Sequence, residues 1–210
     1  MKRALLLLTL SACTSHPAVN FAAADHYLPE EYDRVYQRWT RHAHVTHDFD
    51  TALDASVTLL SQDFRTAYVA RVAASRQLSA DETVRLAREQ QDEAAQAVEF
   101  FLNAQTGRWD WNDFSSVRSL WTLTLVDDQG HELAQPNIQP SLLKSEARAE
   151  LFPPVTPFTR SWRVRFKKPG EGPFPNTTTR WIGLRIAGPL GQTSSDELIW
   201  KSSNASAAVR

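Results

Sequence analysis

The first clear pattern in the chain is a stripe of apolar residues at helical spacing. Pro29, Glu30 and Glu31 place proline and two acids where a helix favours them, at its first turn. The apolar positions that follow recur every three to four residues: Leu28, Tyr32, Val35, Tyr36 and Trp39. This spacing predicts a helix over about 29–42 that buries an aromatic stripe.

The next stretch changes period from that of a helix to that of a strand. Apolar residues occupy odd positions (Val45, Phe49, Leu53, Val57, Leu59), whereas the even positions are mostly polar. Such alternation predicts a long strand over about 45–60 with one face exposed to solvent. The same apolar residues also fit helical spacing through Phe64, so a helix is the alternative.

Two helices are expected after that strand. The pattern from 62 to 77 is helical, and Ser79 with Glu82 forms a capping-box signature that begins a second helix over about 80–97. This second helix has a thin apolar face, which is typical of a helix on the surface.

The rest of the chain has the pattern of an antiparallel sheet protein. A dense apolar run spans 98–104, and the turn signal Asp127-Asp128-Gln129-Gly130 follows an alternating stretch. We expect nine strand residues in the core: Trp121, Leu123, Leu125, Trp162, Val164, Phe166, Ile182, Leu184 and Ile186.

Together these elements predict an α+β fold. We expect an antiparallel β-sandwich, immunoglobulin-like in outline, with an N-terminal helix and a helical insertion between the first two strands. The expected single domain covers 28–201, and a loose tail covers 202–210.

The N-terminus has the layout of an export signal. Lys2 and Arg3 precede a short apolar run over 4–10, which is far below the roughly 20 residues of a membrane-spanning helix. Leu10-Ser11-Ala12-Cys13 resembles the bacterial lipobox. An ordinary signal peptide that leaves Cys13 as an idle thiol is the alternative.

The lipobox resemblance implies a cellular location and a lipid anchor. Residues 1–12 would be removed, and Cys13 would carry lipid in the cell envelope. Thr14, in place of an aspartate, implies sorting to the outer membrane, where we lean towards the periplasmic face. We expect residues 13–27 to be a tether, which leaves the membrane as the one partner that the sequence specifies.

Cysteine count and charge narrow the classes of protein. Cys13 is the one cysteine in 210 residues, so a disulfide scaffold is excluded. Without Lys2 and Arg3 the chain has 21 basic and 24 acidic residues, a formal charge of −3 that argues against a nucleic-acid partner. We expect no cofactor besides the covalent lipid on Cys13.

Three clusters are candidates for chemistry. His42, His44 and His47 with Asp48 have the side chains of a zinc or copper site, although on a strand His47 points away from the other two. Trp109, Asp110 and Trp111 have the composition of a sugar-binding loop, or of a plug for the open end of a sandwich. A basic patch forms if the strands that carry Arg163, Arg165, Lys167 and Arg185 are neighbours.

These observations favour a membrane-anchored, non-enzymatic binding or assembly module with an envelope protein or glycan as partner. The alternatives are a metal-dependent envelope hydrolase that uses His42, His44 and His47, and a glycan-binding module that uses Trp109 and Trp111. The sequence has no Gly-x-Ser-x-Gly elbow and no phosphate-binding glycine loop.

Overall fold

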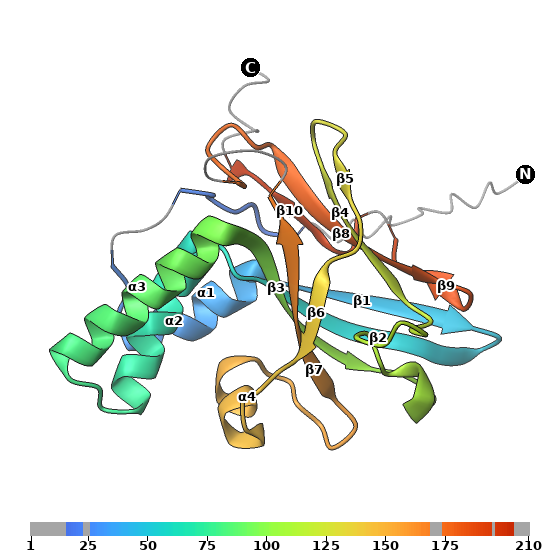
Figure 1. Ribbon diagram of the computed structural model, residues 1–210, viewed down its shortest axis with the longest axis horizontal. Coiled ribbons are helices and arrows are strands. Elements are labelled where there is room, and N and C mark those ends of the chain that lie inside the picture. The colour runs from blue at the N-terminus through green and yellow to red at the C-terminus, as the bar shows by residue number, and fades with distance from the viewer. Residues whose placement is uncertain (1–15, 23–25, 169–173, 195, 204–210) are drawn as a thin grey trace, which may run out of the picture.

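The protein is a mixed α+β fold with two antiparallel β-sheets (Figure 1). The computed structural model describes residues 16–22, 26–168, 174–194 and 196–203. The first sheet contains, in spatial order, β1 (Thr40–His47), β2 (Asp50–Leu59), β3 (Ala97–Gln105), β7 (Arg160–Lys167) and β6 (Asn137–Pro140). The second contains β10 (Ile199–Lys201), β8 (Trp181–Gly188), β4 (Thr122–Asp127) and β5 (Glu132–Leu133), and β9 (Gly191–Gln192) pairs with β8.

The helices gather on one side of the first sheet, as Figure 1 shows. They are the 3-10 turn η1 (Pro29–Glu31), α1 (Tyr32–Trp39), α2 (Gln62–Ser75), α3 (Ala80–Gln96) and α4 (Ser145–Leu151). The 3-10 turn η2 (Trp109–Trp111) lies apart from them, beyond the end of β3 (Figure 1). The expected capping box is present, because Ser79 Oγ accepts from the Glu82 amide while Glu82 accepts from the Ser79 amide. No residue of α3 is buried, which confirms it as a surface helix. None of the helices in the described ranges has the length and apolar character that a bilayer crossing requires.

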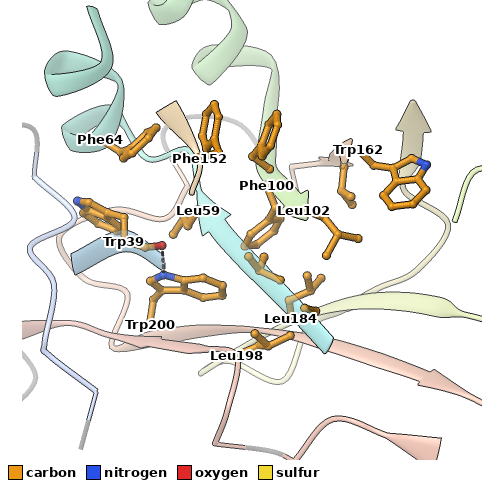
Figure 2. Packing of buried hydrophobic residues seen from close by; sticks show 14 of the residues in the cluster. Trp39, Leu59, Phe64, Phe100, Leu102, Phe152, Trp162, Leu184, Leu198 and Trp200 are labelled. Atoms are coloured by element: carbon orange, nitrogen blue, oxygen red, sulfur yellow. Dashed lines mark hydrogen bonds between the residues drawn. The ribbon is translucent and has the colours of Figure 1, made fainter. Parts of the chain in front are cut away.

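The two sheets share one hydrophobic core. The Phe100 ring of the first sheet lies 5.4 Å from the Trp200 ring of the second, and the Trp200 indole donates to the Trp39 carbonyl at 2.8 Å (Figure 2). All nine residues predicted for the core are buried, at 3% exposure or less. On the opposite face of the first sheet, Phe101 stacks on Phe152 at 3.8 Å, so this face packs against the helical side.

The predicted strand over 45–60 is wrong in one respect, because the structure has a hairpin there. β1 begins at Thr40 and turns at Asp48-Phe49 into β2, so the N-terminal helix ends at Trp39 rather than at about His42. Arg41, Ala43 and Val45 face the core while His42 and His44 alternate outwards, a period that suits a strand. The helix pair therefore follows the second strand of the chain, not the first.

The segment expected to be a tether is partly packed into the domain. Val19 is fully buried and Phe21 is almost so, and their chain lies beside the end of β10. The Val19 amide donates to the Lys201 carbonyl at 2.8 Å, and the Ser203 amide donates to the Val19 carbonyl at 2.7 Å. Ser202 is likewise buried, so the loose tail does not begin at 202.

Candidate functional site

The histidine cluster is not assembled into a metal centre. His42 and His44 are exposed on the outward face of β1, opposite Ser56 and Asp54 of β2. His47 lies at the end of the strand, where its Nε2 is 3.3 Å from the exposed carboxylate of Asp48. Within the described ranges no three histidine, cysteine or acidic side chains are placed to hold a metal ion.

The tryptophan loop belongs to one end of the two sheets. We call this end the loop end, and it consists of the β1–β2 turn, the segment 106–121 and the segment 153–159. Asn112 joins two of these parts, since its Nδ2 donates to the Ala104 carbonyl at 3.0 Å and lies 3.4 Å from the Phe158 carbonyl. Gly107 joins the loop to β2, because a Cβ there would lie 2.5 Å from the Thr51 carbonyl oxygen.

The loop end is closed from inside by aromatic rings. Phe114 is buried, with its ring 4.9 Å from that of Trp162 and 6.2 Å from that of Trp121. Trp111 is half-buried, and its carbonyl accepts from the Trp121 indole at 3.0 Å. The plug that we expected of the tryptophans therefore consists mainly of Phe114, helped by Trp111.

Trp109, in contrast, is available to a ligand. Its side chain is 60% exposed, and the Arg160 guanidinium lies over the ring, 4.7 Å from its centre. Arg108 lies over Trp111 at 5.2 Å and pairs with Asp110 at 3.0 Å. An exposed indole beside charged groups can stack on an apolar or sugar face while its neighbours form hydrogen bonds.

Exposed apolar side chains are concentrated at the loop end. Within the described ranges seven large apolar side chains are exposed, and four of them lie on its loops: Phe49, Trp109, Val117 and Phe158. Of these four, the sequence singled out Trp109 alone. Phe49 had the parity of a core strand residue, and Val117 and Phe158 stand in loops without any periodic signal.

Phe49 is the most unusual of the four. It is fully exposed at the tip of the β1–β2 hairpin, and its φ is +70°, next to Asp48 at φ +46°. A two-residue hairpin turn with positive φ at both positions normally takes Asn-Gly or Asp-Gly. A bulky residue pays a steric cost in this left-handed conformation, and here no burial of the ring offsets it.

A hollow of the described surface lies elsewhere, between α3, the start of β3 and the N-terminal segment. It has a volume of about 480 Å³ and is lined by small and apolar side chains, among them Phe21, Leu59 and Ala94. Glu99 also lines it, but both of its oxygens are occupied by Arg65 and Arg163. The polar side chains of Gln62, Gln91 and Lys168 also line the hollow, beside the ion-paired Glu99.

The basic patch, which required the two strands to be neighbours, does not form, and the alternative of an ordinary solvated face holds. Arg163, Arg165 and Lys167 lie on β7 of the first sheet, whereas Arg185 lies on β8 of the second. Arg163 is also neutralised by Glu93 and Glu99, and Arg185 pairs with Glu132 at 3.0 Å. Alternation placed these side chains outside the core but carried no information on which strands are neighbours.

Cys13 and the rest of the proposed signal lie outside the described residues. No known protein family matches the chain, and no curated protein matches it either. A crystal structure of a novel protein of unknown function from Burkholderia pseudomallei K96243 is similar over 84% of this chain and 89% of its own. Its identity is 9% and its TM-score is 0.36, a likeness too weak to carry an argument.

Proposed function

We propose that this chain is a lipid-anchored, non-enzymatic binding or assembly module of the bacterial cell envelope. Cys13 is the attachment point, and the loop end contacts the partner. The observation that carries the proposal is Phe49, a fully exposed phenylalanine held in a left-handed conformation at a hairpin tip. Unfavourable backbone conformations concentrate at functional sites, where binding offsets their cost.

The architecture supports this use of the loop end. We propose that the fold is immunoglobulin-like in outline, because two antiparallel sheets form a rigid core and present loops at one end. Domains of that kind bind through such loops, because a rigid scaffold fixes positions that the loops are free to vary. Trp109 and Phe158 add exposed aromatic area at the same end of the sheets, and aromatic side chains supply much of the energy of protein interfaces.

The anchor is tested by replacing Cys13. In the full chain, Cys13→Ser should abolish lipid attachment, and the protein should leave the membrane fraction because no other part of the chain is proposed to hold it there. Ser15→Ala is the matched control and should stay in the membrane fraction. Mass spectrometry of the N-terminal peptide and a density gradient that separates the two membranes are the measurements. Sedimentation of Cys13→Ser with membranes contradicts the anchor, and recovery of the wild type in the inner membrane contradicts the outer-membrane location.

The loop end is tested by photo-crosslinking in cells. A photoreactive phenylalanine analogue replaces Phe49 in one variant and Val84 in another. Val84 is an exposed apolar residue of α3, far along the chain from the loop end. We expect a discrete protein adduct from position 49 and none from position 84. Equal adducts from both positions contradict a specific partner at the loop end.

A glycan is the second candidate partner, and the exposed Trp109 ring beside Arg160 and Asp110 favours it. If the partner is a glycan, position 49 gives no protein adduct, and the lipidated protein in detergent co-sediments with purified murein sacculi. Trp109→Ala should then lose sedimentation, because the stacking surface is gone, while Val84→Ala retains it. Absence of both the adduct and sedimentation overturns the binding role of the loop end.

A further inference from the structure

The N-terminal segment is fixed to the domain from Pro17 onward. The Pro17 carbonyl accepts from Arg41 Nη2 at 3.0 Å, and Val19 is hydrogen bonded to the chain on both sides of Ser202. Phe21 follows, with its ring 6.0 Å from that of Trp39 in the core. The tether expected over residues 13–27 therefore ends at Pro17, where the chain is attached to the domain.

The Arg41 side chain, which donates to the Pro17 carbonyl, is itself buried in the domain. Arg41 is 1% exposed, and its guanidinium also donates to the carbonyls of Arg38, Thr40 and Ile199 while lying 5.6 Å from the centre of the Trp200 ring. Burial lowers the pKa of Arg41 to about 10, so it is still charged at neutral pH. Release of Pro17 would leave a donor of this buried cation without its partner, which is costly.

The connection between Pro17 and the proposed lipid is short. Three residues separate Cys13 from Pro17, and the four residue-to-residue steps, at about 3.3–3.6 Å each, span at most roughly 14 Å. A tether free as far as residue 27 would reach several times further. Acyl chains on Cys13 lie within the bilayer, which leaves Cys13 itself at the membrane surface.

We infer that the face of the domain around Pro17 docks against the lipid surface that holds the anchor. This inference rests on the proposed lipidation of Cys13. The face includes His16 and the backbone of Asp196 and Glu197, which lies against the His16 ring. The occupant is the bilayer itself, because a chain this short brings no other large surface to Pro17.

The test measures energy transfer from single labelled positions to the membrane. Lipid occupies Cys13, so an introduced cysteine is the one free thiol of the chain. Asp196→Cys places a donor dye next to His16, and Val84→Cys places it on α3, roughly 15 Å along the helix axis from the end near Phe21. Both full-length lipidated variants are reconstituted in phosphatidylethanolamine and phosphatidylglycerol vesicles that carry an acceptor dye on the headgroups.

We expect higher transfer efficiency from position 196 than from position 84. Insertion of fifteen glycine and serine residues between Ser15 and His16 adds a root-mean-square reach of about 20 Å and should abolish the difference. Equal transfer from the two positions without the insertion, or a difference that persists with it, overturns the docked orientation and leaves the anchor intact. If the wild-type protein purified from membranes carries no lipid on Cys13, the proposed function is overturned, and this inference with it.

Discussion

A single side chain at the tip of the β1–β2 hairpin links the stability of this protein to its proposed role. Phe49 combines full exposure with φ of +70°. The left-handed conformation costs a residue with a Cβ about 1–2 kcal/mol. Since the exposed ring contributes nothing to the core, we assign it to the proposed contact with a partner outside the fold.

We predict that Phe49→Gly stabilises the fold. Glycine removes the left-handed cost, and its greater freedom in the unfolded chain takes back about 0.5–1 kcal/mol, so the net gain is roughly 0.5–1 kcal/mol. Denaturant unfolding monitored by tryptophan fluorescence measures it. Phe49→Leu is the control, and it should show no gain because its side chain meets the same backbone cost. If Phe49→Gly is less stable than the wild type, the ring has a structural role instead.

At the level of elements, a charged cluster fastens the helix pair to the first sheet. Arg65 of α2 binds Glu99 of β3 at 2.7 Å and Glu93 of α3 at 3.0 Å, and Arg163 of β7 binds the same two acids. Glu99 and Arg65 are almost fully buried, and an unpaired charge at either position would be strongly destabilising, so each charge compensates the other. α3 has no fully buried residue, and this cluster attaches it to the sheet alongside the packing of Leu86 against the core.

The cluster should make docking of the helix pair sensitive to acid. Burial alone would raise the pKa of Glu93, but hydrogen bonds and charge from Arg163 and Arg65 outweigh burial and hold the pKa below its ordinary value of 4.5. A carboxyl with a lowered pKa contributes stability that is complete above its unfolded pKa and is lost as pH falls through its folded pKa. We therefore expect the free energy of unfolding to drop as pH falls below about 4.5, with a smaller drop in Glu93→Gln.

The measurement is a series of denaturant unfolding curves at pH values on both sides of that range. Glu132→Gln is the control, because Glu132 belongs to an exposed pair with Arg185 and exposed pairs contribute little. It should retain the acid dependence of the wild type. An unchanged pH slope in Glu93→Gln means that the cluster does not govern the acid response.

At the scale of the whole molecule, local patterns predicted the inner faces of the strands but not their partners. Alternation identified Leu123, Val164 and Ile186 as core residues, and a period-two pattern needs no knowledge of topology. The hairpin was missed because Asp48-Phe49 lacks the usual glycine and because the apolar parity continues through the turn. In the structure the extra residue at Ala52, where the register with β1 shifts, breaks this parity, so that Leu53 is buried while Thr51 and Phe49 are exposed.

The loop end and the N-terminal segment were hidden for the same reason. Their residues carry no periodic signal, and their roles follow from contacts between distant parts of the chain. Val19 and Phe21 stand among small residues that have the composition of a linker, yet they are buried. Phe158 is brought beside the tryptophan loop by Asn112, a contact across 46 positions that no local pattern encodes.

The bridge between Val19 and Ser202 also affects when the domain can finish folding during synthesis. It joins nearly the first described residues to nearly the last, and Arg41 makes a second link of this kind to Ile199. Contacts so distant in sequence form late, because the loop between them must close first. Until the final strand has been synthesised, Val19 lacks both of its backbone hydrogen-bond partners, Lys201 and Ser203. Under the proposed export, the domain therefore closes only after its last strand has been made, and until then the chain lacks the links that would oppose its passage through a membrane channel.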